Sequence, residues 1–196
     1  MGDSLDAAYN LPMKPASIFV VVFLALFVCP FLAAADQDDP TLNALFDRLY
    51  QTVDSLEAHV IQAEIQRVWN ISGSATVDLL LERGTFAMKN GDYFAAERAL
   101  NIVVNRQPNF AEGWNRRATL YYVTGRLEES VADVERTLAL APRHFGALSG
   151  LGQIYVVLGR FDEAREAFRR ALAANPHLSG PRRVLRALDR QLGEPI

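Results

Sequence analysis

The sequence predicts an all-α protein made of helical hairpins stacked on one another, and three observations indicate this fold. Proline recurs every 34 residues, at Pro108, Pro142 and Pro176. Glycine recurs at the same interval, at Gly91, Gly125 and Gly159. Apolar and small residues also recur at this interval, and half of all residues in the chain are hydrophobic. A period of this length is typical of a solenoid, in which each repeat buries its apolar face only against its neighbours.

Five further sets of residues keep the same spacing. They are Leu80, Trp114 and Leu148; Gly84, Ala118 and Gly152; Tyr93, Leu127 and Phe161; Ala96, Ser130 and Ala164; and Leu100, Val134 and Phe168. Tyr121 and Tyr155 also correspond, with Ala87 at that position in the first copy. We expect the large members to fill the space between helices and the small members to permit close approach of paired helices.

This pattern resembles the tetratricopeptide repeat (TPR) in three copies, over residues 77–110, 111–144 and 145–178. The resemblance implies a right-handed α–α superhelix. In the second copy, a first helix over 114–124 should end at Gly125, which tolerates the left-handed conformation of a helix cap. A second helix over 127–140 should end before Pro142, which cannot continue a helix.

Helices are also expected on both sides of the repeats. Residues 36–40 form an acidic linker, and Asp39–Pro40 predicts a helix start. A helical pair within 36–75 should cap the N-terminal end of the solenoid with apolar residues at helical spacing: Leu42, Leu45, Phe46, Leu49, Val53, Val60, Ile61, Ile65, Val68 and Trp69. Residues 179–196 should form a C-terminal capping helix, begun at Ser179 and ended at Gly193, with Val184, Leu185, Leu188 and Leu192 facing the third repeat and Arg182, Arg186 and Arg190 facing out.

Residues 1–35 have the features of a secretory signal peptide. Residues 18–35 contain no charged side chain and end in three alanines, and Lys14 precedes them. Residues 1–12 carry Asp but no Lys or Arg, so we expect translation to begin at Met13. Cleavage after Ala35 would give a periplasmic or secreted protein. The alternative is a membrane anchor that holds the domain outside the cytoplasm, because the apolar run approaches the length that spans a bilayer.

The composition agrees with export from a bacterial cell. Cleavage would remove Cys29, the only cysteine, and a chain without thiols suits an oxidising compartment. Lys14 and Lys89 are the only lysines, and so strong a preference for arginine is typical of a GC-rich bacterial genome.

Charge and motifs exclude several classes of function. The net charge of −3 and the predicted export argue against nucleic-acid binding. The sequence contains no metalloprotease, nucleophile-elbow or P-loop motif, so we expect no enzyme activity and no cofactor. His59, His144 and His177 are too scattered for a metal site, and we expect His144 and His177 to make local hydrogen bonds in turns.

Charge is also uneven along the chain. Residues 36–140 hold 10 Lys/Arg and 16 Asp/Glu, whereas residues 141–196 hold 9 Arg and 5 Asp/Glu. The C-terminal end, at +4, is either an ordinary solvated surface or a basic surface for an acidic partner or anionic headgroups.

The family resemblance places a partner-binding surface on the first helix of each repeat, along the concave face. On this basis the candidate residues are Asn115, Arg116, Thr119, Tyr122, Ser149 and Gln153, with Glu112, Val156, Asp78, Leu81, Thr85 and Met88 around them. The carboxylate clamp of chaperone-binding members is absent, because Leu81, Thr85, Arg116, Gly146 and Gly150 replace its polar residues. Arg117 should lie along the edge of the packed face with its guanidinium in water.

Two functional hypotheses follow. The first is an exported, non-enzymatic TPR scaffold that binds a peptide or loop of an envelope protein on its concave face. The alternative is a structural assembly factor or holdase, acting as a constitutive subunit of an envelope or cytochrome-biogenesis complex through a broad apolar surface. The sequence identifies neither the partner nor the oligomeric state.

Overall fold

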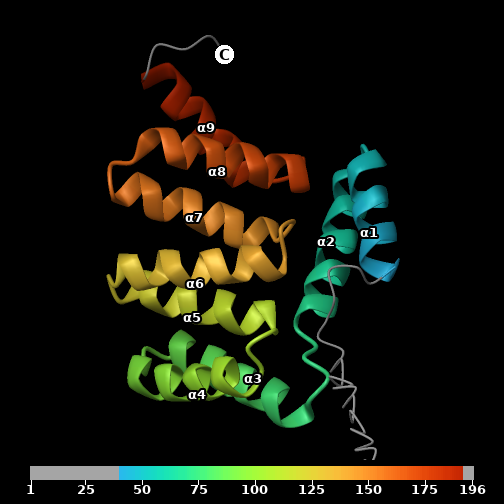
Figure 1. The fold of residues 1–196 in the computed structure, drawn as a ribbon. Coiled ribbons are helices and arrows are strands. Elements are labelled where there is room, and N and C mark those ends of the chain that lie inside the picture. Colours follow the sequence, from blue (N-terminus) through green and yellow to red (C-terminus); the bar gives the residue numbers. More distant parts are fainter. Residues whose placement is uncertain (1–39, 192–196) are drawn as a thin grey trace, which may run out of the picture. The chain divides into compact units, whose positions relative to one another are not determined.

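The computed structural model describes residues 40–191. All regular structure within these residues is helical (Figure 1). The helices are α1 (Pro40–Gln51), α2 (Ser55–Trp69), α3 (Ala75–Lys89), α4 (Tyr93–Arg106), α5 (Ala111–Val123), α6 (Leu127–Leu140), α7 (Phe145–Val157), α8 (Phe161–Ala174) and α9 (Ser179–Gln191). The predicted all-α fold is confirmed, while the expected starts and stops at Asp39 and Gly193 lie outside the described residues.

Each repeat is a hairpin of two helices joined by a glycine with positive φ. In the second repeat, Gly125 has φ +77°. The amide of Gly125 donates to the carbonyl of Tyr122 at 3.1 Å, and the amide of Arg126 donates to that of Tyr121 at 2.8 Å. This pair of bonds is the Schellman motif, which satisfies the last carbonyls of α5. Helix α6 spans the residues predicted for it, and α5 begins three residues earlier than predicted.

Small residues set the distance between the helices of each hairpin. A Cβ atom on Gly84 would lie 2.8 Å from Cγ of Leu100, and one on Gly152 would lie 2.6 Å from the ring of Phe168. In the second repeat, the buried Ser130 hydroxyl donates to the carbonyl oxygen of Ala118 at 2.7 Å. These contacts leave no room for a larger side chain at the small positions.

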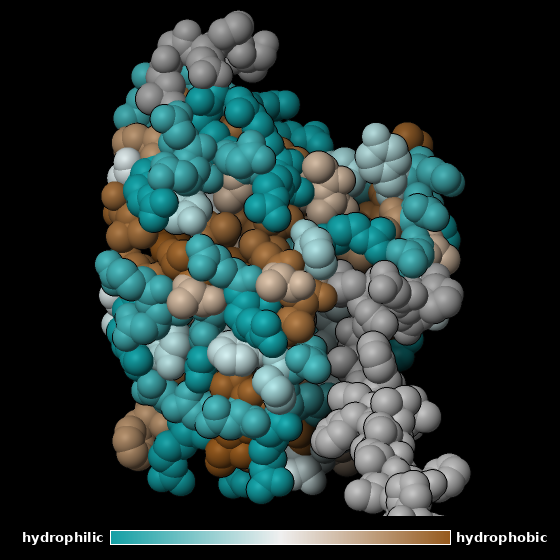
Figure 2. Space-filling model, in the orientation of Figure 1, coloured by the Kyte–Doolittle hydropathy of each residue, from teal (hydrophilic) through white to brown (hydrophobic). Residues whose placement is uncertain are grey.

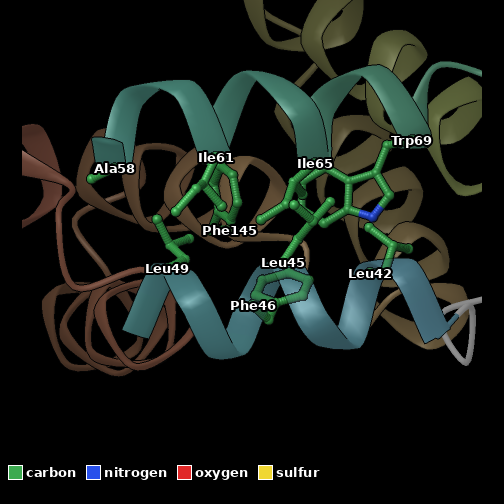
Figure 3. Close-up of a cluster of buried hydrophobic side chains, with 9 residues drawn as sticks. All are labelled: Leu42, Leu45, Phe46, Leu49, Ala58, Ile61, Ile65, Trp69 and Phe145. Atoms are coloured by element: carbon green, nitrogen blue, oxygen red, sulfur yellow. The ribbon is translucent and has the colours of Figure 1, made fainter. Parts of the chain in front are cut away.

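The N-terminal pair, α1 and α2, has its own hydrophobic core (Figure 3). Its buried side chains are Leu42, Leu45, Phe46, Leu49, Ala58, Ile61, Ile65, Trp69 and Phe145. Two residues assigned to this face by their spacing are exposed instead. Val53 is 99% exposed because α1 ends at Gln51, and Val60 is 58% exposed on the outer side of α2.

The N-terminal pair does not cap the solenoid, so this expectation was wrong. The pair packs on Phe145 at the start of α7 and on Ala174 and Leu178 around the end of α8 (Figure 1). Two polar contacts hold it there: Arg143 donates to the Asn43 side chain at 2.5 Å, and His177 Nε2 lies 3.0 Å from the carbonyl oxygen of Leu49. Phe145 accounts for this position, because it extends the core of the pair into the third repeat.

The first repeat consequently keeps an uncovered apolar face. Phe86 is 69% exposed and Phe94 is 72% exposed, and hydrophobic surface is visible at the level of α3 and α4 in Figure 2. At the opposite end, α9 packs Leu188, Val184 and Leu185 against the third repeat around Phe168. The C-terminal cap therefore forms as predicted, although Leu192 lies outside the described residues.

The predicted signal peptide and Met13 start lie outside the described residues. Between residues 40 and 191, no helix has the length and apolar character needed to cross a membrane.

Candidate functional site

The first helices of repeats two and three border a small pocket, which we call the first-helix groove. It is lined on its open side by Thr119 and Tyr122 of α5 and by Gly146, Gly150 and Gln153 of α7. Deeper lining comes from Asn115, Ala118, Ser130, Val134, Ala147 and Ile154, and the volume is about 110 Å³. A Cβ atom on Gly150 would have no neighbour within 4 Å. The absence of a side chain at Gly150 therefore leaves space beside the aromatic ring of Tyr122.

Beside this groove, the end of α2 meets α5 and α7 in what we call the N-terminal junction: Trp69, Asn70, Glu112, Arg116 and His144. The ring of His144 stacks on that of Trp69, with centroids 4.0 Å apart and planes 13° apart. Arg116 donates to the Asn70 side chain at 3.4 Å, and its Nε atom lies 2.6 Å from Oε1 of Glu112. The junction attaches the N-terminal pair to the second and third repeats.

His144 joins α7 to α5 through its two ring nitrogens. Nδ1 accepts a hydrogen bond from the amide of Ala147 at 3.0 Å, so the imidazole caps the N-terminus of α7. A ring nitrogen that accepts carries no proton, so in this tautomer Nε2 holds the proton and donates it to Oε2 of Glu112, 3.0 Å away. The predicted local hydrogen bond is present, and the contacts with Glu112 and Trp69 add to it.

Glu112 is a buried carboxylate held in its charged form by its neighbours. Burial by itself would raise its pKa, but the hydrogen bond from His144, the charge of Arg116 and a 2.9 Å hydrogen bond from the Asn115 side chain outweigh that effect. The net result is a pKa of Glu112 below its usual value. A charge that is this well compensated stabilises the junction rather than acting as a free acid or base.

The sequence model of the tetratricopeptide repeat matches this chain over residues 81–136 and 116–179. The chain belongs to the tetratricopeptide repeat family.

Two curated relatives illustrate how far this likeness extends. A TPR repeat-containing protein of Rhizobium etli is 38% identical over 143 residues, which cover 73% of this chain and 70% of that protein. Hsp70-Hsp90 organizing protein 3 of Arabidopsis thaliana is 29% identical over 113 residues, but the matched part is 20% of that longer protein.

Among solved structures, the first TPR domain of Spaghetti (RPAP3), bound to an HSP90 peptide of sequence SRMEEVD, superposes with a TM-score of 0.59. The alignment covers 62% of this chain and 96% of that domain at 22% identity, which shows a common fold.

The TPR fold separates the six predicted partner-binding residues into different environments. Thr119, Tyr122 and Gln153 line the first-helix groove. Asn115 borders both the groove and the junction, whereas Arg116 is committed to the junction. Ser149 lines neither pocket, and its hydroxyl donates to the carbonyl of Phe145 at 2.7 Å.

Several residues expected around the binding face are part of the packing instead. Leu81 is buried in the core of the first repeat, and Met88 packs against that core. Glu112 is buried in the N-terminal junction, and the Asp78 side chain accepts from the amide of Ser72 at 2.8 Å. The first repeat therefore contributes less to the predicted face than the other two.

Arg117 is also placed differently from the expectation. Its guanidinium makes two hydrogen bonds to the carboxylate of Asp133, at 2.7 and 2.8 Å, and a third to Asn101 at 2.8 Å. It lies over the rings of Trp114 and Tyr121, with its carbon Cζ 4.9 and 5.4 Å from their centroids. The bond to Asp133 raises the pKa of Arg117 above its ordinary value. The guanidinium of Arg117 thus forms an ion pair between two helices instead of lying in water.

The sequence offered little indication of the N-terminal junction. Glu112 and His144 are 32 residues apart, and each could be explained by its position near a helix start. The repeat period relates equivalent positions of the three repeats to one another, but Trp69 precedes the first repeat and has no equivalent position in them. Among the described residues, no group of His, Cys, Asp and Glu is arranged to hold a metal ion.

Proposed function

We propose that this chain is an exported, non-enzymatic interaction module that binds a peptide or exposed loop of another envelope protein in the first-helix groove. The observation that carries the proposal is the space at Gly150, between an aromatic ring on α5 and an amide side chain on α7. An apolar side chain of the partner would enter above Gly146 and Gly150. Gln153 and the hydroxyl of Tyr122 would hydrogen-bond to the partner backbone.

A shape-based test uses one position and two substitutions. Gly150→Phe fills the groove, while Gly150→Ala leaves most of it open and places its Cβ in free space. In cells, crosslinking followed by mass spectrometry should recover the partner with the wild type and with Gly150→Ala, but not with Gly150→Phe. Unchanged recovery with a folded Gly150→Phe variant would reject this groove as the binding site.

The uncovered face of the first repeat favours a second candidate, a subunit of a constitutive assembly complex. Its exposed apolar side chains include Leu79 and Ile102 as well as Phe86 and Phe94. A depression of about 490 Å³ runs along this face, lined by Leu80, Arg83, Phe86, Ala87, Ala95, Arg98, Ala99 and Ile102. Exposed apolar surface of this kind is typical of a contact with another protein.

Native size distinguishes the two candidates. A constitutive subunit should elute from size-exclusion columns as a complex in cell extract, and Phe86→Glu should return it to the size of the free chain. A free interaction module should elute at monomer size with or without that substitution.

The proposed export is tested separately, by finding the compartment of the cell in which the chain is located. The apolar, alanine-terminated segment at 18–35 supports it. Fractionation should find the chain in the periplasm, and N-terminal sequencing should begin at Asp36. A cytoplasmic chain that retains residues 14–35 would reject export without affecting the groove.

A further inference from the structure

A second concave surface lies between α9 and the turn that joins α1 to α2, on a different part of the chain from the first-helix groove. Its volume is about 820 Å³. The lining residues are Tyr50, Thr52, Val53, Pro176, His177, Ser179, Arg182, Arg183, Arg186 and Arg190. We call this surface the arginine groove. Its position depends on the unexpected packing of the N-terminal pair, because α1 supplies one wall and α9 the other.

The wall formed by α9 is strongly cationic. All four arginines are exposed, and no Asp or Glu lines the groove among the described residues. Asp189, the one acid in α9, pairs instead with the buried Arg165 at 2.9 Å. Arg183 and Arg186 make no ion pair with any described residue. The positive charge on this wall is therefore available to a ligand.

The opposite wall is apolar and equally uncovered. Tyr50 is 72% exposed and Val53 is 99% exposed. The contact between His177 Nε2 and the carbonyl oxygen of Leu49 links α1 to the turn before α9, and His177 itself lines the groove. A ligand that fits must present anionic groups to one side and apolar groups to the other.

We propose that the arginine groove binds an extended peptide segment in which acidic and apolar residues alternate. Arg182, Arg186 and Arg190 follow one another at four-residue steps, which places them about 6 Å apart along the helix. In an extended chain, alternate side chains lie on one side about 6.6 Å apart, and the intervening ones point the opposite way. Carboxylates at every second residue thus match the arginines, and the residues between them face Tyr50 and Val53.

The concave shape favours a peptide over a membrane surface. A flat layer of headgroups would touch the rim of the groove but would not reach its interior. Arginine also suits carboxylates, since its planar guanidinium can donate two parallel hydrogen bonds to one of them.

The test compares two synthetic heptapeptides of identical composition, with blocked ends. One alternates, Gly-Glu-Leu-Glu-Val-Glu-Gly, and the other groups its acids, Gly-Leu-Val-Glu-Glu-Glu-Gly. Isothermal titration against residues 36–196 should show the alternating peptide binding about tenfold more tightly, since one or two displaced ion pairs account for that factor. Equal affinity for both peptides would overturn the proposal.

Substitutions then locate the site. Arg186→Gln with Arg190→Gln should weaken binding of the alternating peptide by about tenfold or more. Arg106→Gln with Arg170→Gln removes the same charge from exposed positions outside the groove and should change the affinity less than twofold. Full binding by the first double variant, or an equal loss in the second, would overturn the proposal.

Vesicles provide the remaining comparison. Vesicles containing phosphatidylglycerol should not sediment the wild type at a salt concentration where the alternating peptide binds. Sedimentation that requires Arg186 and Arg190, with no binding of either peptide, would assign the groove to a membrane surface instead. Gly150→Phe should leave binding of the alternating peptide unchanged, so failure of the first-helix groove and failure of the arginine groove are distinguishable.

Discussion

The imidazole of His144 lies parallel to the indole of Trp69 while its two nitrogens contact Ala147 and Glu112. This stack connects the N-terminal helical pair to the repeats. The stability of the junction should therefore depend on the size of the residue at position 69.

Replacing Trp69 by Ala should lower the free energy of unfolding by about 3 kcal/mol or more, because it leaves a cavity in the core of the pair. Trp69→Phe should cost much less, since it keeps an aromatic ring and removes a buried indole N–H that has no partner in the described structure. Chemical denaturation measures both effects. Leu56→Ala, at an exposed position of α2, serves as the control. Equal losses for Ala and Phe would contradict the role of the stack.

Glu112 should make the protein less stable in acid. Its pKa is lower in the folded chain than in the unfolded chain, so the folded state binds fewer protons. The resulting stability is complete above the unfolded pKa, about 4.5, and is lost as the pH falls through the lower folded value. Melting temperatures between pH 3 and 7 should fall less steeply for Glu112→Gln than for the wild type. Glu128→Gln, on an exposed position of α6, should leave the profile unchanged.

Two glycines of α7 should respond to alanine in opposite directions. Gly152→Ala forces a methyl group against the ring of Phe168 and should destabilise the chain by about 1–3 kcal/mol. Gly150→Ala enters open space and should stabilise the chain by up to about 1 kcal/mol through its better helix propensity. Urea titration of both variants measures the contrast. Similar effects at the two positions would argue against the packing seen between α7 and α8.

The Arg117–Asp133 pair should contribute more than the surface ion pairs. Arg117→Ala leaves a buried carboxylate without its partner and should cost about 3 kcal/mol. Arg117→Lys should restore only part of this loss, because an ammonium group cannot donate the same two parallel bonds. The double change Arg117→Ala with Asp133→Ala should cost less than the sum of the single changes. Arg126→Ala, which removes a half-buried pair with Glu97 and a more exposed pair with Glu129, should have a smaller effect.

The repeats could be predicted from the sequence because their determinants are local and periodic. Gly125 ends a helix through its own backbone conformation, and Ser130 fits where a neighbouring helix passes closely. Within the repeats, each hairpin packs mainly on the hairpins next to it, so a position in the period specifies both a helix and its buried side.

The tertiary structure determined where the helices outside the repeats, α1 and α2, are placed. The amphipathic pattern of α1 and α2 predicted two helices with an apolar side, but it could not specify which surface that side would cover. Phe145 extends their core and draws the pair onto α7, while Arg116 donates to the side chain of Asn70 and His144 stacks on Trp69 across the contact. The sequence alone therefore determined the helices and their stacking, because those depend on neighbours at a fixed distance along the chain. Only the folded chain brought α1 beside α9 and left the first repeat uncovered, because contacts between distant segments depend on which surfaces fit together.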